Sequence, residues 1–179
     1  MLILVTGGSA SGKSEYAEQC ITMLHKGKNT LLYLATMQPY GEEGAARVEK
    51  HRKQRAQRHF DTLEWYQNLQ EAPVPEHSDI LLECMSNLAA NELFGEGSAG
   101  KAAVSAILDG VDALCAQARD VVIVSNELFS DGEAYAPETL CYLDVLGEIN
   151  RTVAQHAHRV IEVVCGIPVI HKNEGERAG

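Results

Sequence analysis

The chain has 179 residues, of which 45% are apolar and 22% are charged, close to the averages of soluble globular proteins. No uninterrupted apolar run approaches the roughly 20 residues that a transmembrane helix needs, so the composition excludes a membrane span. Lysine and arginine number 15 against 25 aspartates and glutamates, and the net charge of −10 opposes general binding to nucleic acid or anionic lipid. The length predicts a single domain over residues 1–179.

The cysteines and the N-terminus indicate the compartment. Five cysteines are an odd number, and none forms a Cys-x-x-Cys pair, which indicates reduced thiols. Met1 leads directly into an apolar strand pattern rather than a signal peptide. These features predict a cytoplasmic protein.

Five short aliphatic runs recur along the chain, each too short for a helix, as is typical of buried parallel strands. They are Leu2–Val5, Thr30–Ala35, Ile80–Cys84, Val121–Ser125 and Val160–Cys165. Helical periodicity alternates with them at Ser14–Leu24, Glu42–Arg58, Ala102–Ala118 and Glu138–Ala157. This alternation predicts an α/β fold with a doubly wound, mostly parallel sheet. Tyr33 and the cysteines within apolar surroundings are expected to pack in its core.

A phosphate-binding pattern follows the first predicted strand. It fits GxxxxGK[ST] with Gly7, Gly8, Ser9, Ala10, Ser11, Gly12, Lys13 and Ser14. Backbone N–H groups of such a loop surround a phosphate, the lysine reaches the β- and γ-phosphates, and the hydroxyl that follows can ligate Mg²⁺. The alternative is a chance glycine-rich turn. Because a strand precedes the loop and a helix follows it, the sequence predicts a P-loop NTPase-like domain that binds GTP or ATP.

An acidic partner for Mg²⁺ is expected at the carboxyl end of a neighbouring strand. The run Ile80–Cys84 delivers Glu83 to that end. Ser14 and Glu83 are therefore the predicted metal ligands. A solvated carboxylate at a strand end is the alternative interpretation of Glu83.

A basic segment interrupts an otherwise acidic chain. Its members are Arg47, Lys50, His51, Arg52, Lys53, Arg55, Arg58 and His59. A spacing of four places Arg47, His51, Arg55 and His59 on one helical face, where the guanidinium groups could hold a triphosphate and favour the neutral imidazole. A neutral imidazole can attack an α-phosphate and carry the nucleotide as a phosphoramidate. By composition alone, a solvated charged helix is the favoured explanation of the segment, because charge runs on helices are usually surface.

Several sequence segments together resemble one enzyme family along nearly the whole chain. They are Leu2–Gly8, Gly12–Ser14, Tyr33–Thr36, Ala45–Arg52, Ile80–Cys84 and Val122–Glu127. They are similar to four motifs of one family: an apolar strand ending in Thr-Gly-Gly, an Ala-Arg-Ile-x-x-His-basic pattern, a Leu-Leu-Glu-Cys strand and a Val-x-Asn-Glu motif. The chain thereby resembles the bifunctional adenosylcobinamide kinase and adenosylcobinamide-phosphate guanylyltransferase family of cobalamin biosynthesis.

The resemblance implies a fold, a chemistry and a set of residues. The family has a mostly parallel P-loop sheet and forms homotrimers. Its members phosphorylate the aminopropanol hydroxyl of adenosylcobinamide, a corrinoid, with ATP or GTP and then transfer GMP from GTP through a histidine, with Mg²⁺ in both steps. By resemblance, His51 carries GMP and Lys13 acts in catalysis, and the residues around the nucleotide beyond the phosphate loop are Ala35, Thr36, Met37, Arg52, Lys53, Gln54, Arg55, Glu64 and Glu83.

The sequence departs from the family pattern in one region. Leu128–Asp131 replaces the Gly-x-Gly that follows Asn-Glu, and Leu140–Asp144 retains only the aspartate of an Arg-x-Phe-Arg-Asp pattern, whereas Gly147 and Asn150 are kept. Ala10 also stands where many members carry arginine. These departures favour the hypothesis that guanylylation of His51 is retained while corrinoid binding or the kinase step is organised differently.

Two other functions compete with this interpretation. In the first, an ordinary P-loop small-molecule kinase uses the basic segment to hold an acceptor phosphate, and His51 is never modified. In the second, a degenerate regulatory protein binds GTP without turnover. The combination of Lys13, Ser14, His51 and Glu83 favours an enzyme, because a binding protein needs neither the histidine nor the strand-end carboxylate.

Overall fold

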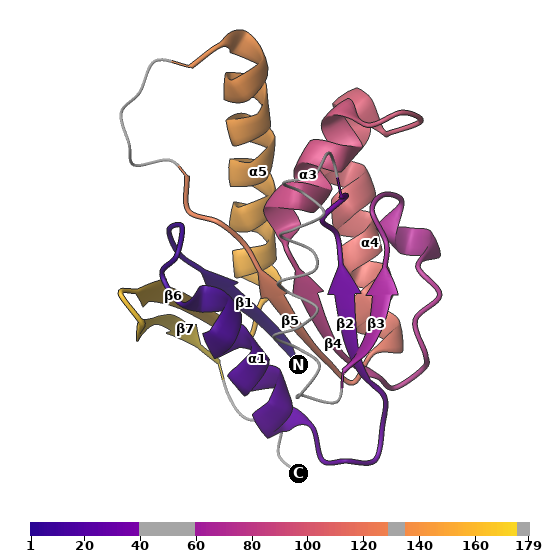
Figure 1. The fold of residues 1–179 in the computed structure, drawn as a ribbon, viewed down its shortest axis with the longest axis vertical. Coiled ribbons are helices and arrows are strands. Elements are labelled where there is room, and N and C mark those ends of the chain that lie inside the picture. The colour runs from indigo at the N-terminus through magenta and orange to yellow at the C-terminus, as the bar shows by residue number, and fades with distance from the viewer. Residues whose placement is uncertain (40–59, 129–134, 175–179) are drawn as a thin grey trace.

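The computed structural model describes residues 1–39, 60–128 and 135–174. A seven-stranded sheet has the strand order β3-β2-β4-β5-β1-β6-β7 (Figure 1). The strands are β1 (Leu2–Thr6), β2 (Leu31–Ala35), β3 (Asp61–Glu64), β4 (Asp79–Glu83), β5 (Asp120–Val124), β6 (Arg159–Val164) and β7 (Ile167–Asn173). Every pairing among β1–β6 is parallel, and β7 runs antiparallel to β6. The predicted mostly parallel α/β sheet is therefore confirmed.

Helices cover both faces of this sheet (Figure 1). The helices are α1 (Lys13–Leu24), α3 (Met85–Phe94), α4 (Ala103–Gln117), α5 (Pro137–His156) and two short 3-10 turns, η1 (Leu69–Glu71) and η2 (Gly100–Ala102). Helix α1 packs on one face, and α3, α4 and α5 pack on the other. The predicted helix Glu42–Arg58 lies outside the described residues. None of the helices in the described ranges is long and apolar enough to cross a membrane.

The central strands show why the aliphatic runs were readable from the sequence. In β1, Ile3 and Val5 pack toward α1, whereas Leu2 and Leu4 pack toward the opposite layer of helices. All four side chains are buried. A strand buried on both faces needs apolar residues at consecutive positions, and this produces a continuous run instead of an alternating pattern.

Two strands and one α-helix were not predicted, and each has a physical reason. Strand β3 is an edge strand whose sequence Asp-Thr-Leu-Glu is mostly exposed, so it lacks an apolar run. Helix α3 follows β4 after one residue, Cys84, and the sequence contains no turn signal there. Strand β7 pairs with β6 through a tight turn in which Cys165 (φ 50°) and Gly166 (φ 81°) both adopt positive φ, a hairpin geometry that asparagine and glycine signal more clearly than cysteine does.

A buried ion pair fixes the far end of α1. The carboxylate of Asp79, fully buried at the start of β4, accepts hydrogen bonds from Arg119 (Nη2 to Oδ2, 2.8 Å) and lies 2.8 Å from Nδ1 of His25. Arg119 also donates to the carbonyl of Leu24, the last residue of α1, at 2.6 Å. The helix that follows the phosphate loop is therefore anchored to the amino ends of β4 and β5.

Candidate active site

The predicted phosphate loop connects the carboxyl end of β1 to the first turn of α1. A Cβ atom on Gly7 would lie 2.5 Å from the carbonyl oxygen of Val163, and Gly12 has a φ of 91°, so both positions need glycine. The loop backbone is held from two sides: the Glu127 N–H donates to the carbonyl of Gly7 at 3.1 Å, and the Gly166 N–H donates to the carbonyl of Ser11 at 2.8 Å. The strand–loop–helix context predicted for this motif is confirmed.

Lys13 spans this loop. Its side chain is largely buried, and Nζ donates a hydrogen bond to the Gly8 carbonyl at 3.0 Å. Burial lowers the pKa of the ammonium group below its ordinary value, while Cys84 and Glu83 oppose this shift. The lysine therefore sits partly desolvated at the point where the loop would hold a phosphate.

Glu83 is brought to the phosphate loop by the sheet order. Strand β4 ends at Glu83, and one carboxylate oxygen accepts a hydrogen bond from Oγ of Ser14 at 2.5 Å. The other oxygen accepts from the phenol of Tyr33, a buried residue of β2. A hydroxyl and a carboxylate are hard oxygen donors of the kind that Mg²⁺ prefers, so Ser14 and Glu83 fit the predicted metal role.

Tyr33 is a site residue that the sequence interpretation missed. It packs in the core as expected, between the α1 face of the sheet and Phe60, whose ring lies edge-on at a centroid distance of 6.0 Å. Its phenol nevertheless reaches the carboxylate of Glu83. The only sequence signal for this contact is a tyrosine near the end of the predicted strand Thr30–Ala35. Recognising it requires knowing that β2 lies beside β4 in the sheet.

Thr36 joins the ends of β2 and β4. Its N–H donates to the Glu83 carbonyl at 3.0 Å, and its hydroxyl both donates to the carbonyl and accepts from the N–H of Cys84, each at 2.8 Å. Asn91 of α3 in turn donates to the Thr36 carbonyl at 2.9 Å. These bonds fix the backbone on both sides of Glu83, so Thr36 has a structural role beside the predicted nucleotide contact.

The remaining predicted residues have different positions. Ala35 pairs in register with Glu64 on one side and with Glu83 on the other. Both acidic residues therefore lie at the carboxyl ends of the parallel strands. The Glu64 side chain is exposed and accepts a hydrogen bond from the phenol of Tyr66 at 2.9 Å. Met37 is half-buried just beyond β2. The predicted residues His51, Arg52, Lys53, Gln54 and Arg55 lie outside the described residues.

A second polar network lies at the ends of β4 and β5. Asn126 donates to Oγ of Ser86 at 2.6 Å, and Ser86 Oγ lies 3.0 Å from Sγ of Cys84. Ser125 donates to Asn150 of α5 at 2.6 Å. Burial raises the pKa of the Cys84 thiol, so this cysteine is a neutral structural group at neutral pH. Within the described part of the chain, no group of three or more histidine, cysteine or acidic residues could hold a metal by itself.

Comparison with known proteins places these features in a family. A model of the family described as cobinamide kinase / cobinamide phosphate guanyltransferase matches residues 3–170. The bifunctional adenosylcobalamin biosynthesis protein CobU of Escherichia coli (strain K12) is 36% identical over 186 residues, covering 94% of this chain and 98% of that protein. The protein of the same name from Salmonella typhimurium (strain LT2) is 34% identical with the same coverage.

Among solved structures, the flagellar accessory protein FlaH of Methanocaldococcus jannaschii gives a TM-score of 0.47 at 13% identity, over 97% of this chain and 78% of that chain. The family match spans the phosphate loop, Tyr33, Glu83 and the segment around His51. The two relatives are matched over almost their whole length. The chain therefore belongs to the cobinamide kinase / cobinamide phosphate guanyltransferase family of enzymes.

Proposed function

We propose that this protein catalyses two successive transfers to a corrinoid. The first moves the γ-phosphate of ATP or GTP to the aminopropanol hydroxyl of adenosylcobinamide, and the second moves GMP from GTP to that phosphate. Family membership supports the reaction class. The observation that carries the proposal is the contact between Ser14 and Glu83, made across the phosphate loop by residues 69 positions apart.

In the first step, this chain positions the triphosphate. The loop N–H groups and the amino end of α1 attract the phosphates, and Lys13 exchanges its contact with the Gly8 carbonyl for phosphate oxygens. Glu83 accepts from both Ser14 and Tyr33, so the Ser14 hydroxyl hydrogen points at the carboxylate and its lone pairs are free for a cation. Mg²⁺, when bound with the nucleotide, would neutralise charge that develops on the phosphate oxygens.

In the second step, His51 is the proposed nucleophile. Its imidazole nitrogen attacks the α-phosphorus of GTP, a P–N bond forms, and the bond to the β-phosphate oxygen breaks to release pyrophosphate. An oxygen of the corrinoid phosphate then attacks the same phosphorus, and the P–N bond breaks to return neutral imidazole. The basic residues Arg52, Lys53 and Arg55, with Gln54, are proposed to hold the triphosphate during this exchange.

The test of the kinase step is transfer of label from γ-labelled GTP or ATP to adenosylcobinamide. Glu83→Gln keeps the shape of the side chain but removes its charge, and we expect kcat to fall roughly 100-fold. The matched control is Glu76→Gln, because Glu76 is exposed in the loop before β4 and its change should leave kcat unaltered. Turnover of the nucleotide with no label in the corrinoid would contradict the proposal, as would full activity of Glu83→Gln.

The affinity for nucleotide should also depend on pH through Lys13. Burial lowers the Lys13 pKa in the free protein from 10.5, and a bound phosphate favours the charged ammonium, so binding takes up a proton once the pH exceeds the free-state pKa. We therefore expect the affinity for a non-hydrolysable GTP analogue to weaken as pH rises toward 10. In Lys13→Arg the guanidinium stays charged. Identical pH profiles for this variant and the wild type, measured by calorimetry, would refute the assignment.

We further propose that residues 1–179 form a single nucleotide-binding domain that assembles as a cytoplasmic homotrimer. An exposed apolar surface on the β6–β7 hairpin supports self-association: Val164, Ile167, Val169 and Ile170 have exposed fractions of 47%, 66%, 42% and 61%. Strand β7 is also an edge strand, and an uncovered edge with apolar side chains is a surface that another chain can cover. Because the hairpin turn bonds the phosphate loop through Gly166, assembly at this surface would support the loop.

A further inference from the structure

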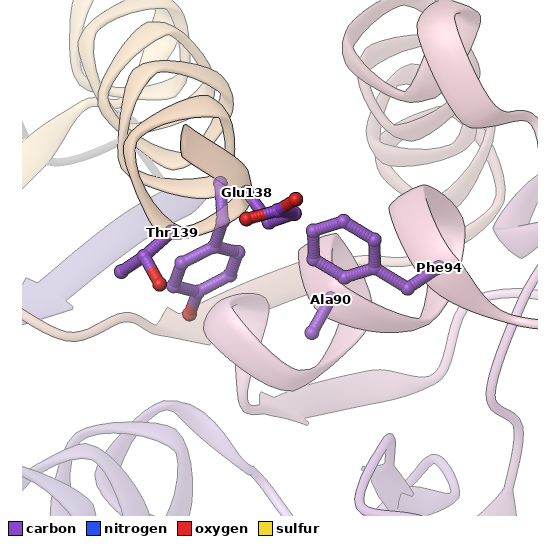
Figure 2. Close-up of a pocket in the computed structure, with 5 residues that line it drawn as sticks. Ala90, Phe94, Glu138 and Thr139 are labelled. Carbon is purple, nitrogen blue, oxygen red and sulfur yellow. The ribbon is translucent and has the colours of Figure 1, made fainter. Parts of the chain in front are cut away.

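An apolar pocket lies between α3 and α5, outside the nucleotide residues described above. Ala90 and Phe94 of α3 line it together with Glu138 and Thr139 of α5, and Figure 2 shows the Phe94 ring beside the Glu138 side chain. Tyr142 is the fifth lining residue, and the cavity has a volume of about 230 Å³. The Phe94 side chain is 58% exposed, so an aromatic ring stands at the mouth of the pocket with much of its surface available to a ligand.

We propose that this pocket binds an edge of the corrin ring of the acceptor substrate. The inference rests on the proposed function, because it assigns the corrinoid subsite of the same reaction. The periphery of a corrin ring carries methyl groups and amide arms, and a pocket of this size can take one such edge but not the whole macrocycle. Among the described residues, the pocket lining contains no cationic side chain, which makes it unsuitable for a phosphate.

Hydrogen bonds connect one lining residue of the pocket to the catalytic end of the sheet. The phenol of Tyr142 donates to the Ser86 carbonyl at 3.2 Å, and Ser86 contacts Cys84 and Asn126. Cys84 directly follows Glu83, whose carboxylate accepts a hydrogen bond from Ser14 at the end of the phosphate loop. The pocket is thus linked to the phosphate loop through Tyr142, the first turn of α3 and Glu83.

The chemistry of the lining fits this occupant. Burial raises the pKa of Tyr142 to about 12, so the phenol stays neutral and its donated hydrogen remains engaged with Ser86. The aromatic rings of Phe94 and Tyr142 supply apolar contact for the ring periphery. Glu138 is exposed in the first turn of α5, and its carboxylate complements the net positive charge of a cobalt(III) corrinoid.

The subsite also falls where the sequence departs from the family pattern. Tyr142 lies within the segment Leu140–Asp144, and Thr139 directly precedes it. This segment lacks two arginines of the family motif. Replacing cationic side chains beside a cationic ligand with apolar and hydroxyl groups favours corrinoid contact at this position. The altered region is therefore consistent with a subsite that differs in its contacts from those of relatives and remains functional.

Two variants test the subsite from opposite directions. Phe94→Ala removes the ring at the mouth, and Ala90→Trp fills the cavity. We expect each to raise the KM and the dissociation constant for adenosylcobinamide at least tenfold, the loss typical of a well-packed aromatic contact, while the KM for GTP stays within twofold. The matched control is Leu140→Ala, because Leu140 is an exposed apolar residue of α5 that does not line the pocket.

The readouts separate failure of the subsite from failure of the proposed function. An unchanged KM for GTP shows that each variant is folded. If the wild type phosphorylates adenosylcobinamide and both variants bind it as tightly as the wild type does, the pocket assignment is overturned alone. If the wild type transfers no phosphate, the proposed function fails, and equilibrium dialysis with adenosylcobinamide still decides the pocket: weaker binding in both variants supports it, and no binding to the wild type overturns it.

Discussion

Replacing Lys13 by methionine is expected to lower the rate of phosphate transfer to adenosylcobinamide by roughly 100- to 1,000-fold. Lys13 is a cation of the phosphate loop, and its Nζ bonds the loop at Gly8. A preorganised positive charge at developing phosphate charge is worth several kcal/mol in the transition state. Methionine keeps the apolar stem and removes only the charge, so kcat with saturating nucleotide isolates the electrostatic contribution.

The control for this experiment is Lys28→Met. Lys28 is exposed in the loop after α1, so its substitution changes the net charge equally without touching the site. We expect its kcat to equal that of the wild type. A Lys13→Met variant that retains more than a tenth of the wild-type kcat, with its fold confirmed by circular dichroism, would show that the loop does not bind the transferred phosphate as described.

Replacing His51 by alanine is expected to abolish GMP transfer and to leave the kinase step in place. Only the second step needs a covalent nucleotide carrier, because direct phosphorylation requires no nucleophile from the protein. Adenosylcobinamide phosphate should then accumulate in reactions containing GTP. The measurement is the fraction of α-label bound to denatured protein, which should be acid-labile and alkali-stable in the wild type and lost in the variant.

His59→Ala provides a matched control for that result. His59 shares the basic segment and the predicted helical face with His51, but it is not the residue that the family resemblance assigns. Labelling of His59→Ala at the wild-type level would localise the modification. Label that persists in His51→Ala and disappears in His59→Ala would instead assign the nucleophile to His59.

The sequence predicted the centre of the sheet better than its edges. In β1 and β4, burial on both faces demands consecutive apolar residues, and the predicted runs Leu2–Val5 and Ile80–Cys84 match the observed strands to within one residue at each end. At the edges this demand disappears. Strand β3 has only one residue that is not fully exposed, Leu63, and β7 depends on a Cys165-Gly166 turn that few sequence rules recognise.

The candidate site was predictable as a list of residues but not as an arrangement. The spacing of Gly7, Gly12 and Lys13 fixes a phosphate loop because backbone geometry requires glycine at two of these positions. The contact of Ser14 with Glu83 depends on the position of β4 within the sheet, which local sequence does not encode. Tyr33 shows the same limit, because its phenol acquires a functional partner only when β2 lies beside β4.

The most direct test of the account follows two labels into one product. Wild-type protein is incubated with adenosylcobinamide, Mg²⁺ and GTP carrying label at either the γ- or the α-phosphate, and the corrinoid is then isolated. The account predicts that both labels enter the corrinoid, the γ-label in the first transfer and the α-label in the second. Incorporation of the γ-label alone would identify a kinase without guanylyl transfer, and a corrinoid free of both labels would contradict the proposed function altogether.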